Sequence, residues 1–130
     1  MKKEKYLIFI VEDDDVFREM LVDELSENKL LEIFSFSTGE KCLSQLEQNP
    51  DIIILDHYLN KADPEAKSGM EIIDEFQKSS PESKIIILSH ALSDVMFEYL
   101  MKKDVYSYIV KGEDAFQELK NQIDEIIFAL

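Results

Sequence analysis

The sequence predicts an α/β fold in which helices cover both faces of a doubly wound sheet of five parallel strands. Two observations lead to this class. Five short strand-like segments alternate with five segments of helical periodicity, which is typical of parallel sheets. Three of the strand segments are continuous apolar runs, which indicates that they are buried from both sides. With 130 residues, 45% of them apolar, the chain is expected to form one domain over residues 1–130.

The first half of the chain carries five of these elements. Residues 6–11, "YLIFIV", predict a buried strand, and residues 15–28 then show helical periodicity. Apolar side chains share one face of this helix: Phe17, Met20, Leu21 and Leu25. Residues 31–37, "LEIFSFS", mix apolar and polar side chains and predict a less buried or edge strand. A helix over residues 37–50 and a buried strand over residues 51–55, "DIIIL", follow.

The second half repeats the pattern. Residues 68–80 predict a helix, residues 84–88, "KIIIL", a buried strand, and residues 92–103 a helix. Residues 105–110, "VYSYIV", predict a second mixed strand, and residues 113–130 a final helix. The final helix has one apolar stripe: Phe116, Leu119, Ile123, Ile126 and Leu130. Two helices begin with the spacing of a capping box: Ser37 with Glu40, and Ser68 with Glu71.

The charge of the chain restricts its partners. There are 28 acidic against 14 basic residues, and the formal net charge is −14. Such a surface repels phosphate backbones, so direct binding to nucleic acids or anionic membranes is disfavoured. The single Cys42 excludes an internal disulfide and is expected to be a buried, unreactive thiol. Because no signal peptide or membrane-spanning apolar run is present, we expect a cytoplasmic protein.

Polar residues follow the strands at the edge where such sheets bind ligands. In open α/β sheets this edge is formed by the carboxyl ends of the strands, where the winding direction reverses. The residues that directly follow the strands here are Glu12, Asp13, Asp56, Ser89 and Lys111. We therefore expect three carboxylates, one hydroxyl and one ammonium group to lie at one edge of the sheet.

These side chains indicate a cation site and phosphoryl transfer. Converging carboxylates need a counter-cation, and all-oxygen ligands suit a hard ion such as Mg²⁺. Lys111 would add a second positive charge, and Ser89 a hydrogen-bond donor for a phosphoryl oxygen. Asp56 is the natural nucleophile because a carboxylate can form an aspartyl-phosphate, and Glu12 and Asp13 would hold the metal.

The same residues carry a resemblance to a known family. The segments "FIVEDD", "IIILD", "IIILS" and "YIVK" occur in this order on the expected elements. In this respect the whole chain resembles a receiver domain of two-component response regulators, of the CheY type. The resemblance implies a flavodoxin-like (βα)5 fold with strand order 2-1-3-4-5.

The resemblance also implies roles for individual residues. Asp56 matches the phosphoacceptor, Asp13 a direct Mg²⁺ ligand and Glu12 a ligand through water. Tyr58 would offer its backbone carbonyl to the metal. As a family feature, Lys111 would complete the set of catalytic groups.

Two residues would form the switch that the family uses. Ser89 matches the hydroxyl residue that moves toward the phosphoryl group. Tyr108 matches the aromatic residue that turns inward when the hydroxyl residue moves.

Several positions depart from the family pattern. The loop over residues 57–69 is longer than usual by roughly five residues, and is either an insertion or a lid beside the site. His90 replaces a usually small residue, and Gly112 stands where Pro is frequent. Asp14 is expected to be solvated, and Asp15 to cap the first helix or interact with its dipole.

The resemblance implies a phosphorylation-dependent switch rather than an ordinary enzyme, since the chain would catalyse only its own phosphorylation and dephosphorylation. A sensor histidine kinase or a histidine phosphotransfer protein would be the donor, and a downstream protein the target. The face made by the fourth helix, fifth strand and fifth helix would respond, and is a candidate homodimer surface. Whether the chain acts alone or within a longer regulator stays open.

Three other functions compete with this one. A degenerate receiver would serve only for protein interaction or dimerisation. A flavodoxin-like FMN protein is disfavoured because Glu12 and Asp13 would repel the FMN phosphate. A phosphatase with an aspartate nucleophile is disfavoured because Tyr58 stands where a second acid is required.

Overall fold

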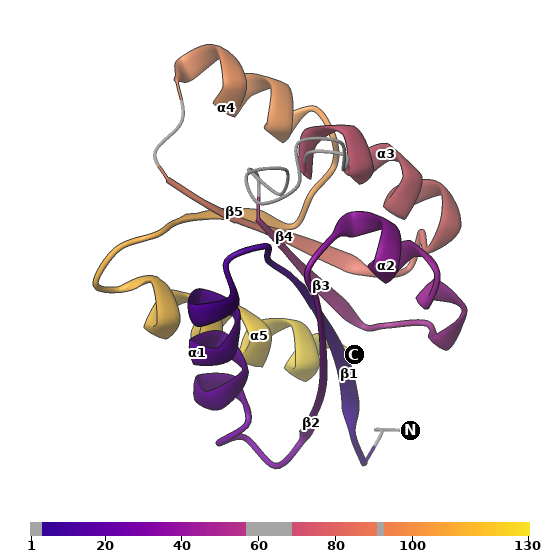
Figure 1. The fold of residues 1–130 in the computed structure, drawn as a ribbon, viewed down its shortest axis with the longest axis vertical. Helices are drawn as coiled ribbons and strands as arrows, with labels where there is room; N and C mark the ends of the chain where they lie inside the picture. Colours follow the sequence, from indigo (N-terminus) through magenta and orange to yellow (C-terminus); the bar gives the residue numbers. More distant parts are fainter. Residues whose placement is uncertain (1–3, 57–68, 91–92) are drawn as a thin grey trace.

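Five parallel strands form one sheet in the order β2-β1-β3-β4-β5 (Figure 1). The computed structural model describes residues 4–56, 69–90 and 93–130. The strands are β1 (Tyr6–Val11), β2 (Leu31–Phe36), β3 (Ile52–Asp56), β4 (Lys84–Ser89) and β5 (Ser107–Val110). The predicted class and strand order are thus confirmed, and the two mixed segments form the edges of the sheet.

Helices lie on both faces of this sheet. They are α1 (Asp15–Leu25), α2 (Gly39–Leu43), α3 (Gly69–Ser79), α4 (Asp94–Met101) and α5 (Ala115–Ala129), with a short 3₁₀ helix η1 (Leu46–Gln48). Figure 1 shows α1 and α5 on one face and α2, α3 and α4 on the other.

The strands feed two hydrophobic cores because successive side chains point to opposite faces. The first core joins strands to α1 and α5; its fully buried members include Ile8, Ile10, Ile52, Ile54, Ile86, Leu21, Leu119 and Ile123. The second joins them to α2, η1, α3 and α4; its members include Phe9, Val11, Ile53, Leu55, Ile87, Cys42, Ile72, Phe76 and Leu100. Burial on both faces is the reason that the central strands are continuously apolar.

The predicted helix over residues 37–50 is wrong in its length. The chain instead forms α2, a break, and η1. At the break, the Ser44 hydroxyl donates to the Lys41 carbonyl at 2.6 Å, and the Gln45 amide donates to the Cys42 carbonyl at 2.9 Å. A side chain therefore satisfies the carbonyl that the next helical amide would bind, and the helix tightens and ends.

Two predicted helix starts also differ. Thr38, rather than Ser37, caps α2, because its Oγ1 accepts the Lys41 amide at 3.2 Å. Asp14, which was expected to be solvated, caps α1 in place of Asp15: its Oδ1 accepts the amides of Val16 and Phe17 in the first turn at 3.0 and 3.1 Å. The capping box predicted at Ser68 lies outside the described residues.

Two apolar residues lie off the faces assigned to them. Met20 is 47% exposed although Leu21 and Leu25 of the same helix are buried. Leu130 is 53% exposed because it follows the end of α5, and the buried part of that stripe ends at Ile126.

Helices α2 and α3 approach each other at Gly39. A Cβ atom at this position would lie 2.6 Å from Cγ1 of Ile72, a fully buried residue of α3. Because Ile72 has no free space to move into, any larger side chain here would push the two helices apart.

We expect Gly39→Ala to lower the free energy of unfolding by about 1–3 kcal/mol, because it overpacks the α2–α3 contact. Gly112→Ala is the matched control, since no atom lies within 4 Å of the added methyl group and the backbone there is not left-handed. The control should be neutral or stabilising by about 0.5 kcal/mol. Urea unfolding followed by circular dichroism measures both, and equal stability of the two variants would contradict the close approach.

Candidate functional site

The register of the sheet brings the ends of four strands together. Val11 of β1 pairs with Leu55 of β3, so the next residues, Glu12 and Asp56, lie side by side. On the other side of β3, Ser89 ends β4 and pairs with Val110 of β5. Because β1 leads outward to β2 while β3 leads to β4 and β5, this edge is where the winding reverses.

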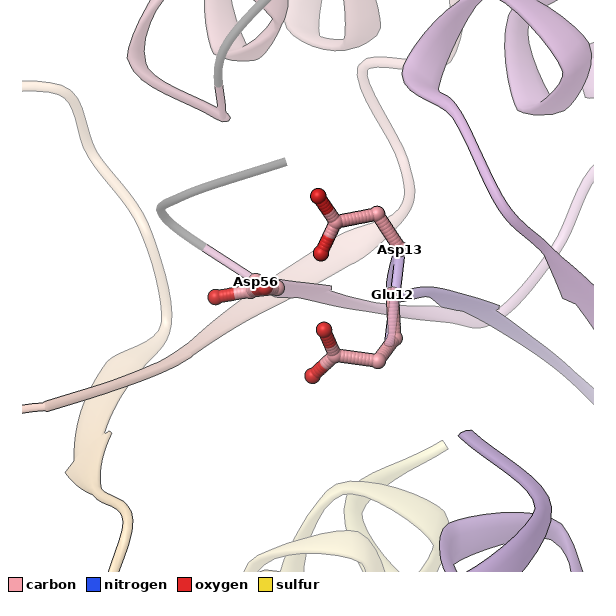
Figure 2. A group of neighbouring side chains, drawn as sticks. All are labelled: Glu12, Asp13 and Asp56. Atoms are coloured by element: carbon pink, nitrogen blue, oxygen red, sulfur yellow. The ribbon is translucent and has the colours of Figure 1, made fainter. Parts of the chain in front are cut away.

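Three carboxylates meet at this edge. One carboxylate oxygen from each of Glu12, Asp13 and Asp56 lies within 4.8 Å of the other two. Figure 2 shows Glu12 and Asp13 reaching from the end of β1 to either side of Asp56. Glu12 and Asp56 are buried and Asp13 is 9% exposed. An all-oxygen, anionic set of this kind fits a hard divalent cation such as Mg²⁺.

An ammonium group lies against two of these carboxylates. Nζ of Lys111 lies 2.9 Å from Oε1 of Glu12 and 3.5 Å from Oδ1 of Asp56. The Lys111 side chain is 14% exposed, so both ion pairs are largely shielded from water. Among the described residues, this one ammonium group therefore lies against two of the three converging carboxylates.

This crowding of charge changes two pKa values. Burial, together with the hydrogen bond and charge of Asp56, raises the pKa of Glu12 from 4.5 to about 8, against the opposing effect of Lys111. Burial lowers the pKa of Lys111, but Glu12 and Asp56 outweigh it and raise that pKa overall. The site therefore favours added positive charge, whether from a proton or from a metal ion.

Ser89, at the end of β4, adds a buried hydroxyl group to this edge of the sheet. The residue is fully buried, and its Oγ has no hydrogen-bond partner in the part of the chain that the structure describes. Its position is fixed by the backbone, because the Lys111 amide donates to the Ser89 carbonyl at 2.7 Å. A buried hydroxyl without a partner is costly, so this one is suited to donate to a group that binds later.

Comparison with known proteins gives this arrangement a family. Residues 8–124 match the family described as the response regulator receiver domain. The chain belongs to the response regulator receiver family.

Individual relatives agree with this assignment. The receiver is 25% identical over 113 residues to the "Probable C4-dicarboxylate response regulator DctR" of Bacillus subtilis (strain 168), and this match covers 85% of the receiver. It spans about half, 48%, of the length of that protein.

Two solved structures share the fold. A CheY-like receiver domain protein from Methanospirillum hungatei superposes with a TM-score of 0.83 at 20% identity, over 96% of this receiver and 95% of that chain. The BeF3-activated receiver domain of DrrB, a Thermotoga maritima protein, superposes with a TM-score of 0.80 at 22% identity, over 95% and 97%.

The four consecutive acidic residues 12–15 take part in contacts that hold the segment between β1 and α1 in place. The Asp14 amide donates to Oε2 of Glu12 at 3.3 Å, and Nη1 of Arg18 donates to the Glu12 carbonyl at 2.7 Å. Arg18 also pairs with Asp15 of the first helical turn at 2.6 Å. Asp14 and Asp15 therefore hold the loop and the start of α1, which leaves Glu12 and Asp13 to face the site.

Arg18 and Phe17 also contact the site, although the sequence predicted no role there for either: Phe17 was expected only on the apolar face of the first helix. For Arg18 the sequence did contain a signal, because Asp15 and Arg18 have the i, i+3 spacing of an ion pair on one helix. For Phe17 the sequence contained no signal. The centroid of its ring lies 4.6 Å from Nζ of Lys111, and only the folding of the chain brings these two distant residues together.

The remaining predicted residues lie near the site or outside the described part. The Tyr108 hydroxyl donates to the His90 carbonyl at 2.9 Å, and its ring packs edge-on against Phe97 of α4 at 5.8 Å. His90 itself is exposed. Tyr58 and residues 57–68 of the long loop lie outside the described residues.

Two further findings concern Cys42 and Gly112. Cys42 is fully buried in α2, as predicted, and burial raises the pKa of its thiol to about 12. Gly112, which stands where Pro is frequent in the family, follows Lys111 through a trans peptide bond, since the described residues contain no cis peptide bond. Among the helices that the structure describes, none has the length and apolar character needed to cross a membrane.

We expect the metal-free receiver to lose stability as the pH rises from about 5 to about 8. In this interval Glu12 holds a proton in the folded state that the unfolded chain has released, so the free energy of unfolding falls with pH, by roughly 3–4 kcal/mol. Glu12→Gln should remove this component, whereas Asp15→Asn, which changes an exposed carboxylate in the first turn of α1, should keep it. Urea unfolding in a chelator at several pH values measures the difference, and parallel curves for wild type and Glu12→Gln would refute the assignment.

Proposed function

We propose that this receiver accepts a phosphoryl group on Asp56 from a phosphohistidine, in a reaction that depends on Mg²⁺. The donor would be a sensor histidine kinase or a histidine phosphotransfer protein. The observation that carries the proposal is the surroundings of Asp56. Its carboxylate is buried at the reversal of the sheet, 3.5 Å from the Lys111 ammonium and beside two further carboxylates.

The transfer is a displacement at phosphorus. An Asp56 carboxylate oxygen attacks, the P–O bond forms, and the P–N bond of the phosphohistidine breaks with its electron pair left on the imidazole nitrogen. The products are an aspartyl-phosphate and free histidine. Hydrolysis resets the receiver: a water oxygen bonds to phosphorus, the bond from phosphorus to the Asp56 oxygen breaks, and inorganic phosphate leaves.

The residues present fit the proposed ion. Glu12, Asp13 and Asp56 supply carboxylate oxygens for Mg²⁺, and we propose the Tyr58 carbonyl as a further ligand on the basis of the family resemblance. The ion would neutralise charge on the phosphoryl oxygens. Lys111 would supply a second positive charge, and Ser89 would donate its unused hydroxyl to a phosphoryl oxygen.

Contacts of Ser89 and its neighbour suggest how phosphorylation of Asp56 would change the exposed face formed by α4, β5 and α5. Ser89 is followed directly by His90, whose carbonyl accepts the Tyr108 hydroxyl. Movement of Ser89 toward a phosphoryl group would therefore shift the acceptor that holds Tyr108. This would bias the equilibrium between two arrangements of α4, β5 and α5.

We propose that this α4–β5–α5 face contacts the downstream partner. It carries exposed apolar side chains: Val95, Phe97, Tyr99, Met101, Tyr106 and Val110. A downstream protein target is the proposed occupant, and a second copy of the chain in a homodimer is the alternative. The net charge of −14 argues against direct binding to nucleic acid.

The first test is phosphorylation by acetyl phosphate, followed by intact mass. With Mg²⁺ we expect one added phosphoryl group in the wild type, and none in Asp56→Asn or with excess chelator. Asp13→Asn should slow the reaction by about tenfold or more because it removes a proposed metal ligand. Asp23→Asn, which removes an exposed carboxylate later in α1, should change the rate by less than about twofold.

The competing function predicts the opposite result. A wild type that stays unmodified, at times when another receiver reacts, would favour a degenerate receiver that only binds partners. A rate that does not depend on Mg²⁺ would remove the metal from the proposal.

The second test uses beryllofluoride with Mg²⁺, because a receiver of this fold is known in its BeF3-activated form. We expect backbone NMR shifts in the wild type to extend from the neighbours of Asp56 through Ser89 to Tyr108 and α5. Asp56→Asn should show none of them. Ser89→Ala should keep the shifts near Asp56 and lose those at Tyr108; if Tyr108 still responds fully, the proposed route through Ser89 is wrong.

A further inference from the structure

We propose that Phe17 is a positioning residue for phosphoryl transfer, and that the face of its ring holds the Lys111 ammonium at the site. This inference rests on the proposed function. It concerns a contact between the first turn of α1 and the end of β5 that lies beyond the charged groups described above.

The distance and burial are suited to a cation–π interaction. Nζ of Lys111 lies 4.6 Å from the centroid of the Phe17 ring. Such contacts are attractive up to about 6 Å and become stronger when water is excluded. The Lys111 side chain is 14% exposed and Phe17 is partly buried against the first core, so little water separates the ammonium from the ring.

The ring is itself held from two sides. The Phe17 amide donates to Oδ1 of Asp14 at 3.1 Å, which fixes the backbone at the start of α1. The ring packs against Phe116 of α5, with centroids 5.8 Å apart and planes inclined by 32°. Because the cap and α5 define where the ring lies, the ring can in turn define where the ammonium lies.

An aromatic ring offers what a further carboxylate would not. The Lys111 ammonium has three N–H groups, and the Glu12 and Asp56 carboxylates already attract it. Another carboxylate would add negative charge to a site that must accept an anionic phosphoryl group. The ring attracts the cation through its quadrupole without net charge.

The ring also leaves the ammonium free to change partners. A hydrogen bond to a carboxylate is directional, whereas attraction to a ring face tolerates small displacements of the cation. Lys111 can therefore move from Glu12 toward a phosphoryl oxygen while it stays over Phe17. In this way the ring would keep the positive charge in place both before and after transfer.

Simple hydrophobic packing of Phe17 is the competing explanation, and ring fluorination separates the two. Fluorine atoms withdraw charge from the ring face while the shape and apolar character of the ring are largely kept. We would replace Phe17 with phenylalanines that carry one, two and three fluorine atoms, and measure the rate of phosphorylation by acetyl phosphate with Mg²⁺.

If the ring face holds Lys111, the rate should fall stepwise with fluorine number, and Phe17→Leu should be roughly 3- to 30-fold slower than wild type. Phe17→Tyr, which keeps a π face, should retain most of the rate. A rate that is independent of fluorine number would overturn the proposal.

Two controls make the result specific. The same fluorinated series at Phe116, which contacts Phe17, should leave the rate nearly unchanged; an equal fall at both positions would overturn the proposal. In the metal-free protein, NMR should show the Lys111 ε-methylene protons shifted upfield by the ring in wild type and at ordinary positions in Phe17→Leu. Absence of that difference would refute the contact.

The outcomes also separate this inference from the proposed function. An unreactive wild type would overturn the proposed function, and with it the role of Phe17 in the reaction. A reactive wild type with an insensitive Phe17 would overturn only the inference.

Discussion

The ion pairs between Lys111 and the buried carboxylates of Glu12 and Asp56 are the interaction on which the rest of the site depends. Buried charges are tolerated only when they are paired, and removing one partner of such a pair generally costs about 3–5 kcal/mol. Here, among the residues that the structure describes, the Lys111 ammonium lies against two members of a group of three converging carboxylates. Burial, together with the hydrogen bond and charge of Asp56, raises the pKa of Glu12 in spite of this ammonium group. A site in this condition gains free energy when it takes up another cation, and this property links the architecture to the proposed Mg²⁺-dependent chemistry.

The fold supplies the rigidity that this arrangement needs. Because β1 and β3 are buried on both faces and paired in register, the residues that follow them have little freedom to separate. The loop after β1 is held by its own polar side chains: Asp14 caps α1, and Arg18 binds both the Glu12 carbonyl and Asp15. Four consecutive acidic residues are therefore divided between two tasks, since Glu12 and Asp13 face the site while Asp14 and Asp15 stabilise the approach to it.

The site is also connected to the α4–β5 region through His90, the residue that follows Ser89. Ser89 ends β4 with an unused hydroxyl, and the next residue holds the Tyr108 hydroxyl through its carbonyl. Tyr108 contacts helix α4 through Phe97, and this helix has several exposed apolar side chains. A charge added at Asp56 would thus act on a small number of defined contacts, which is a physical basis for the proposed switch.

The sequence by itself determined the strands, their order of burial and the polar residues at their ends, because apolar runs and strand-end positions are local properties of the chain. It placed Glu12, Asp13, Asp56, Ser89 and Lys111 at one edge, and the structure brings them together there. Only the tertiary structure decided which of Ser37 and Thr38 caps α2, where that helix ends, and that Met20 faces outward. It alone placed Phe17 over Lys111. The cap and the end of α2 depend on local hydrogen bonds, and more than one nearby hydroxyl group could have made the cap, so the sequence pattern did not choose between them. The position of Phe17 depends on elements distant in the chain, and no local pattern records which distant neighbour a residue will meet.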